Sequence, residues 1–226
     1  MKRLRIILLA NSLALAVAGA AVAQSAAPAP SKDPAAGKMM TLQMPALPDP
    51  VAVTLPSATT AVFVADMIDR TCGPQPSCTG QMEPAIAALL AKARKAGVYV
   101  VYSKPSGVTS GVLPAVAPAQ GDPIIDGHGQ DRFYNTDLDA MLKAKGIKNL
   151  ILTGWKVSGS VVYTSVGATL RGYTVVVPED ASLAATDYDI AIGRYQILTQ
   201  NAANASNEPL KPQTSTLSRT DMITFK

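Results

Sequence analysis

The stretch Leu152–Tyr173 places the strongest constraint on how this chain folds. It begins in a short apolar run, Leu150–Leu152, which is typical of a strand buried on both faces. Gly154 ends that run, helix-compatible residues follow, and Gly172 stands where glycine commonly ends a helix. A strand, a tight turn and a helix in this order place Ser160 at the carboxyl end of the strand. Open α/β sheets carry their sites at that edge.

Strand-like and helix-like segments alternate along the rest of the chain. The predicted strands are 60–65, 98–102, 150–152, 173–177 and 215–217. The predicted helices are 82–96, 137–145, 159–171 and a last one that begins after Thr186. Alternation of this kind favours an α/β, three-layer Rossmann-like fold, with a mostly parallel sheet and helices on both faces.

Three polar residues are predicted to cap these helices. Ser158 precedes the helix that ends near Gly172, and Thr186 precedes the last helix. Thr136 has an acidic residue three positions later, Asp139, in a pattern that resembles a capping box.

The first 58 residues are not expected to belong to the folded core. Residues 1–23 read as a signal peptide: a basic start, an apolar run and the cleavage pattern Ala21–Ala23, with Gln24 as the mature start. An uncleaved membrane anchor is the alternative. Residues 24–58 are rich in alanine and proline and predict a tether followed by an extended lead-in. The domain itself is predicted to span 59–226.

Removal of the leader changes the charge of the chain. The full sequence has 20 basic and 16 acidic residues, and the leader contains Lys2, Arg3 and Arg5. The mature chain is therefore almost neutral. Its lysines and arginines are scattered and its aromatics are few, so nothing indicates a nucleic-acid surface. A periplasmic or secreted protein without a stable membrane span is expected.

Asp66 directly follows the first predicted core strand. An acidic residue there lies at the carboxyl edge of the sheet, as Ser160 does, and we interpret it as a site residue. The alternative is a carboxylate that merely caps the next turn.

Cys72 and Cys78 are the only cysteines and lie six positions apart. In an exported protein such close cysteines are expected to form a disulfide, which would pin the loop beside Asp66. This spacing without a nearby histidine makes a poor zinc site, and a catalytic thiol is the other alternative.

Three sequence motifs resemble the isochorismatase-like (cysteine hydrolase) superfamily. The segment G-W-K-V-S-G-S-V-V-Y-T-S-V-G-A-T-L-R-G-Y, residues 154–173, is similar to the family pattern G-V-A-T-N-x-C-V-x-x-T-A-x-D-A-x-x-x-G-Y. The segment that begins at Asp66 resembles the family's D-M-x-x-D/N. The third match is to K-x-x-x-S-x-F-x-x-T-D-L-D and comprises Phe133, Thr136, Asp137, Leu138 and Asp139.

The resemblance implies an altered catalytic set. It places the family's catalytic aspartate on Asp66 and its nucleophilic cysteine on Ser160. The family's lysine falls on Gly127, and the aspartate of T-A-x-D-A falls on Gly167. Serine needs a stronger base than cysteine does, so covalent amidase chemistry is not favoured. A subclass without the cysteine cleaves vinyl ethers with its aspartate as proton donor, and Ser160 fits that scheme better.

Four further residues are candidates for ligand binding. His128, the only histidine, is one position from the missing lysine, and Phe133 lies in the same motif. Lys156 is a candidate substitute for the lysine, and Trp155 stands beside it; the resemblance implies a cis peptide between these two. A solvated histidine and a surface lysine are the alternatives.

The resemblance implies a hydrolase of small molecules, acting on an amide C–N or a vinyl-ether bond. Loss of activity, leaving a periplasmic small-molecule-binding or vestigial protein, is the alternative. No cofactor and no metal is expected, because the metal-binding members use two histidines near the first strand and this chain has one in total. Family members often form oligomers, so a homo-oligomer is a further expectation.

Overall fold

The computed structural model describes residue 41 and residues 43–200 and 203–226. The signal-peptide prediction for 1–23 and most of the tether prediction lie outside the described residues. Residues 45–226 form one compact unit, to which the following description applies. Within the described part of the chain, no helix is both long and apolar enough to span a membrane.

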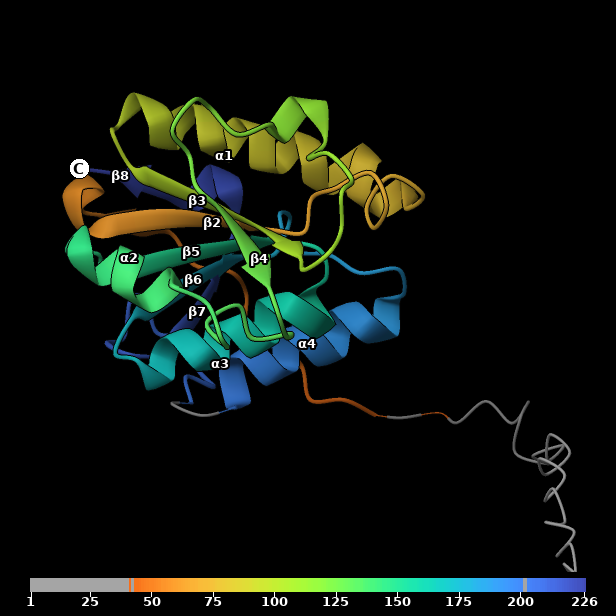
Figure 1. Ribbon diagram of the computed structural model, residues 1–226. Coiled ribbons are helices and arrows are strands. Elements are labelled where there is room, and N and C mark those ends of the chain that lie inside the picture. Colours follow the sequence, from red (N-terminus) through yellow and green to blue (C-terminus); the bar gives the residue numbers. More distant parts are fainter. Residues whose placement is uncertain (1–40, 42, 201–202) are drawn as a thin grey trace, which may run out of the picture. The chain divides into compact units, whose positions relative to one another are not determined.

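A six-stranded parallel sheet forms the centre of this unit (Figure 1). Its strand order is β4-β3-β2-β5-β6-β7, and every neighbouring pair is parallel. The strands are β2 (Thr60–Ala65), β3 (Tyr99–Pro105), β4 (Ile124–Gly127), β5 (Asn149–Gly154), β6 (Thr174–Pro178) and β7 (Ser215–Ser218). The predicted parallel sheet is confirmed, and β2 has the predicted bounds.

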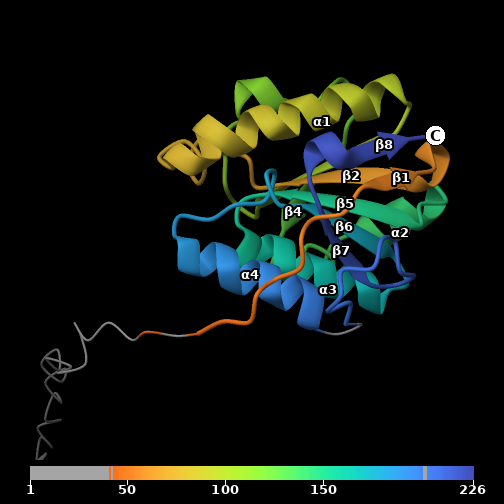
Figure 2. The ribbon, with the colours of Figure 1, turned by 180° about the vertical axis from the view of Figure 1, so that it is seen from behind.

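Helices cover both faces of this sheet, as Figures 1 and 2 show, so the predicted three-layer fold is confirmed. Helix α1 (Glu83–Lys95) packs on one face of the sheet, and a hydrophobic core lies between them. A second hydrophobic core lies on the other face of the sheet, where three helices pack: α2 (Leu138–Ala144), α3 (Val162–Leu170) and α4 (Asp187–Thr199).

Strand β2 shows why an unbroken apolar run was required at this place. Val62 and Val64 point into the core under α1, whereas Phe63 points into the opposite core. Successive strand residues face opposite sides, so a strand with a helix layer on each side needs apolar residues at every position. Full burial of one such side chain stabilises the fold by about 1.5–3 kcal/mol.

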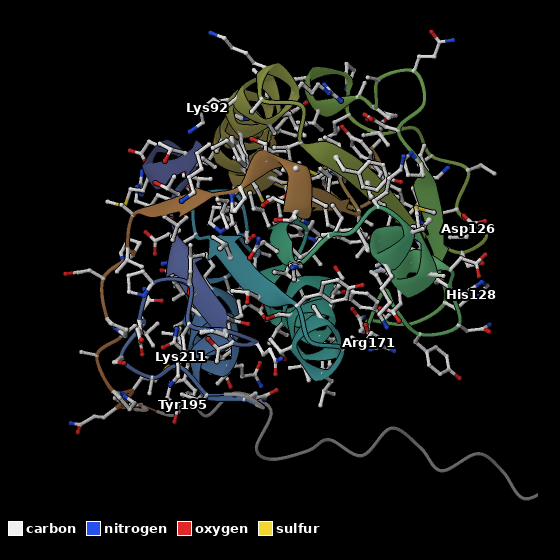
Figure 3. All side chains as sticks on the ribbon, turned by 90° about the vertical axis from the view of Figure 1, so that its left-hand side faces the viewer. Lys92, Asp126, His128, Arg171, Tyr195 and Lys211 are labelled. Carbon is white, nitrogen blue, oxygen red and sulfur yellow. A yellow bond between two sulfur atoms is a disulfide. The ribbon has the colours of Figure 1, made fainter. Side chains whose placement is uncertain are left out.

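Three short strands were not expected: β1 (Val53–Leu55), β4 and β8 (Ile223–Phe225). β4 lies outside the predicted strands, and β1 lies in the predicted extended lead-in. β1 pairs in parallel with β8, and Lys92 of α1, labelled in Figure 3, donates hydrogen bonds to the carbonyls of Thr220 and Ile223. Each strand is too short to show a period, and the partner of β1 is far away in sequence.

The capping predictions had mixed outcomes. Thr186 caps α4, where its hydroxyl accepts from the Asp189 N–H at 3.1 Å. Ser158 does not cap a helix: it donates to the Asp189 carboxylate at 2.8 Å, and a π-helical turn, η4 (Val157–Val161), precedes α3. No capping box forms at α2, because the Thr136 hydroxyl donates to the Arg132 carbonyl. The Thr136 hydroxyl also accepts from the Leu138 N–H at 3.4 Å, and Asp139 pairs with Lys143 and Tyr173 and does not reach back to Thr136.

Candidate active site

Asp66 lies at the carboxyl end of β2, at the edge expected from the sequence. It is buried, with 4% of its surface exposed, and its φ is +56°. Left-handed backbone is uncommon for residues other than glycine and clusters at functional sites. Its N–H donates to the Ser103 carbonyl, and its own carbonyl accepts from the Thr71 hydroxyl. These bonds fix the turn that aims the carboxyl group.

The Asp66 carboxyl group has a charged partner that sequence analysis did not identify. The Arg132 guanidinium forms an ion pair with Oδ2, and the Ser103 hydroxyl donates to Oδ1 at 3.2 Å. Burial raises the pKa of Asp66 above its ordinary value, and Arg132, Ser160 and Ser103 offset part of that rise. A carboxyl group whose pKa is raised can exchange protons closer to neutral pH.

Ser160 lies on the segment from Gly154 to Ser160, which we call the elbow. The elbow passes very close to β2, because a Cβ on Gly154 would lie 2.7 Å from the carbonyl carbon of Ala65. Ser160 is buried, and its hydroxyl donates to the Trp155 carbonyl at 2.8 Å. The peptide between Trp155 and Lys156 is cis, as expected.

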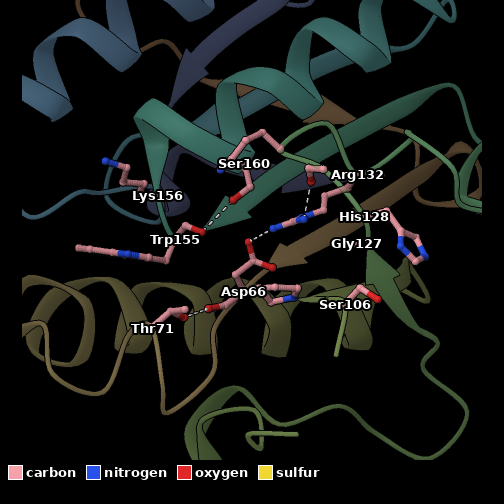
Figure 4. A pocket seen from close by; sticks show the side chains of 12 residues that line it. Asp66, Thr71, Ser106, Gly127, His128, Arg132, Trp155, Lys156 and Ser160 are labelled. Carbon is pink, nitrogen blue, oxygen red and sulfur yellow. Dashed lines mark hydrogen bonds and ion pairs between the residues drawn. The ribbon is translucent and has the colours of Figure 1, made fainter. Parts of the chain in front are cut away.

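Asp66, Arg132 and Ser160 converge on one cavity of about 600 Å³ (Figure 4). It opens at the carboxyl edge of the sheet, where β2, β4 and the elbow meet. Its lining residues are Asp66, Thr71, Pro105, Ser106, Gly127, His128, Gly129, Gln130, Arg132, Trp155, Lys156 and Ser160. The size suits a small organic molecule.

Most of the predicted site residues line this cavity, and one of them lies elsewhere. His128 and Trp155 line it, as does Lys156. Phe133 is a correction: its ring is buried in the core, stacks on Tyr173 at 5.8 Å and lies under the Arg171 guanidinium. Apolar side chains in a motif can match a family because they pack, without touching a ligand.

Lys156 does not replace the missing lysine. Its ammonium group pairs with Asp189 at 3.3 Å, and its side chain points away from Asp66 in Figure 4. The cation that contacts Asp66 is Arg132. The signal available in the sequence was a single arginine inside the third motif, one residue before Phe133.

Cys72 and Cys78 form the expected disulfide, with Cα atoms 5.5 Å apart. The bridge closes the segment that also presents Thr71 to the cavity. Across the residues that the structure describes, no group of three or more His, Cys, Asp or Glu side chains is arranged to hold a metal ion.

Replacing both cysteines by serine is expected to lower the free energy of unfolding by about 2–3 kcal/mol, because the bridge closes only a short loop. Urea unfolding of the double variant and of the oxidised protein measures the difference. Ser77→Ala, a change in the same loop that leaves the bridge intact, is the control. Equal unfolding midpoints for the oxidised protein and the double variant would contradict a stabilising bridge.

Comparison with known proteins finds a family and relatives that are similar to this chain. The family model described as Isochorismatase domain matches residues 60–206. Ureidoacrylate amidohydrolase RutB of Methylorubrum extorquens is 28% identical over 204 residues, covering 69% of this chain and 81% of the relative. Secreted isochorismatase effector Isc1 of Verticillium dahliae is 31% identical over 109 residues, covering 43% of this chain and 57% of the relative.

Solved structures share the fold. N-carbamoylsarcosine amidase from Thermoplasma acidophilum aligns with a TM-score of 0.60 and 24% identity, covering 72% of this chain and 97% of that one. An isochorismatase-like hydrolase from Alkaliphilus metalliredigens aligns with a TM-score of 0.62 and 20% identity, covering 73% and 96%. At these identities the likeness concerns the fold alone.

Proposed function

Because the chain belongs to the isochorismatase family, we propose that it is an exported hydrolase of small molecules that uses Asp66 to move the proton and forms no covalent intermediate on Ser160. The export part rests on the leader pattern in residues 1–23. The substrate class is an amide C–N or a vinyl-ether bond, and the amide option draws support from the amidohydrolase named among the relatives.

One observation carries the proposal: Asp66, Ser160 and a cation meet at one cavity. The carboxyl group, the Arg132 guanidinium and the Ser160 hydroxyl all line the same space of about 600 Å³. Their elements come from three separate parts of the chain, and the cavity lies where parallel α/β sheets carry their sites. A cavity of this size is typical of a small-molecule site.

Asp66 can move the proton in either reaction, amide hydrolysis or vinyl-ether cleavage. In amide hydrolysis its carboxylate takes a proton from water, the water oxygen attacks the carbonyl carbon, and the proton goes to the leaving nitrogen as the C–N bond breaks. In vinyl-ether cleavage the protonated carboxyl gives its proton to the methylene carbon. Water then adds to the carbon that bears the ether oxygen, a proton returns to the carboxylate, and the hemiketal breaks down.

Ser160 is poorly placed to act as the nucleophile. Its hydroxyl donates to the Trp155 carbonyl oxygen at 2.8 Å, and that oxygen is a hydrogen-bond acceptor but not a base. Asp66 is the base within reach, and its charge is already shared with Arg132 and Ser103. Nucleophilic serines elsewhere depend on a well-placed base, most often histidine, and His128 is exposed on the cavity wall.

A second function, ligand binding without turnover, is favoured by a separate observation. Both oxygens of Asp66 already have partners, Arg132 on Oδ2 and Ser103 on Oδ1. A carboxylate held in this way can present a fixed charge to a ligand without exchanging protons.

A hydrolysis screen of the mature chain against small amides and vinyl ethers separates the two functions. We expect turnover without a burst, no acyl adduct on Ser160 by mass spectrometry, and retention of most activity in Ser160→Ala. The physical reason is that water, not the hydroxyl, attacks. A stoichiometric burst with an acyl-serine would refute the non-covalent scheme. Binding of the same compounds without hydrolysis would select the second function.

A further inference from the structure

Gly127 has no room for a side chain, because Arg132 occupies that space. A Cβ built on Gly127 would lie 2.8 Å from both Cδ and Cζ of Arg132, and Nη1 would be closer still. Gly127 is buried at the end of β4. The guanidinium therefore fills the volume that a residue 127 side chain would otherwise take on its way to Asp66.

A second glycine, Gly167, likewise leaves a space that a charged side chain fills, here that of Asp131, the neighbour of Arg132. A Cβ on Gly167 of α3 would lie 2.6 Å from the carboxyl carbon of Asp131. That carboxylate accepts from the Phe133 N–H and lies 3.6 Å from the Arg171 guanidinium. Two consecutive charged residues thus project into spaces that two distant glycines leave open.

The backbone of Arg132 is fixed against the helix that follows the elbow. Its N–H donates to the Thr164 hydroxyl of α3 at 3.1 Å, and its carbonyl accepts from Thr136 at 2.6 Å. Its Nη1 donates to the Gly129 carbonyl, while Nη2 contacts Asp66. The orientation of the guanidinium is therefore set by the segments on both sides of the cavity.

We propose that Arg132 is the positioning residue that pairs with the Asp66 carboxyl group and aims it into the cavity, and that residue 127 is glycine to admit it. The inference rests on the proposed function and assigns Arg132 as the cation that pairs with Asp66. Each side chain of this pair is 6% exposed, and removal of one partner would leave the other charge buried and unpaired. Guanidinium suits a buried ion pair because it stays charged and is weakly hydrated.

Other cations at the cavity do not meet this requirement. Lys156 is bound to Asp189 with 41% of its side chain exposed, and His128 is exposed. Among the described residues that line the cavity, Arg132 is the cation in contact with Asp66. It also lowers the pKa of that carboxyl group against the larger effect of burial.

The test moves the cation from residue 132 to residue 127 in the full mature chain. The variants are Gly127→Ala, Arg132→Ala and Arg132→Ala with Gly127→Lys. Gly80→Ala is the control, because a Cβ there meets nothing within 4 Å. The titration of the Asp66 carboxyl carbon by NMR is the first readout. The second is the pH profile of kcat/KM on a substrate found in the screen.

In Gly127→Ala and in Arg132→Ala we expect the pKa of Asp66 to rise above that of the unaltered protein. We also expect kcat/KM to fall at least about tenfold, as a misplaced catalytic group requires. The relocated lysine should return the pKa toward the original value and raise kcat/KM at least about tenfold over Arg132→Ala. Gly80→Ala should match the unaltered protein in both readouts.

An Asp66 titration that is the same in the unaltered protein, Gly127→Ala and Arg132→Ala would overturn the proposal. So would a relocated lysine that behaves like Arg132→Ala alone. If Arg132→Ala does not fold, Gly127→Ala still tests the contact with a single added methyl group. The titration needs no substrate, so a failed hydrolysis screen counts against the proposed function and leaves this inference to be decided by NMR.

Discussion

Asp66→Asn is expected to reduce turnover by about 10²–10⁴-fold, because the amide can neither accept nor supply the proton of the reaction. The measurement is kcat/KM on a substrate found in the screen. Asp126→Asn is the matched control, since Asp126 is exposed on β4 and outside the cavity. Full activity in Asp66→Asn would remove Asp66 from the mechanism.

The raised pKa of Asp66 predicts a pH dependence for the activity and another for the stability of the protein. Amide hydrolysis needs the carboxylate and should fall as pH drops through the raised pKa, whereas vinyl-ether cleavage needs the acid and should fall as pH rises through it. The folded state holds the proton more tightly than the unfolded chain, whose value is about 3.8. Stability from Asp66 is therefore fully present below 3.8 and is lost as pH rises through the folded pKa.

Gly154→Ala is expected to destabilise the protein by more than about 4 kcal/mol, an effect reserved for a few mechanisms such as severe overpacking. A Cβ there would collide with the carbonyl group of Ala65, and the φ of Gly154 is +114°. The Gly154 N–H also donates to Ala181, and the next N–H, that of Trp155, donates to Ala65. Denaturant unfolding, or the loss of soluble protein on expression, measures the result.

Gly172→Ala separates the cost of the positive φ from the cost of the steric collision. Gly172 also has a positive φ, +91°, but a Cβ there meets nothing within 4 Å. The backbone conformation alone should cost about 1–2 kcal/mol. Equal losses in Gly154→Ala and Gly172→Ala would show that the approach of the elbow to β2 is not the constraint.

Much of the fold was predictable because it depends on local pattern. The buried run 60–65 and the apolar strand before Gly154 specify central strands without reference to any partner. The cap at Thr186 and the helix end at Gly172 are likewise local. The short strands β1 and β8 were missed because they exist only through pairing with each other.

The sequence by itself determined the sheet, the elbow and the meeting of Asp66 and Ser160 at one edge, because strand order and chain direction bring carboxyl ends together. Only the tertiary structure decided which cation serves Asp66. Lys156 turns to Asp189, and Arg132 reaches Asp66 through the space left by Gly127. A long side chain takes its direction from what packs around it, and those neighbours are far apart along the chain.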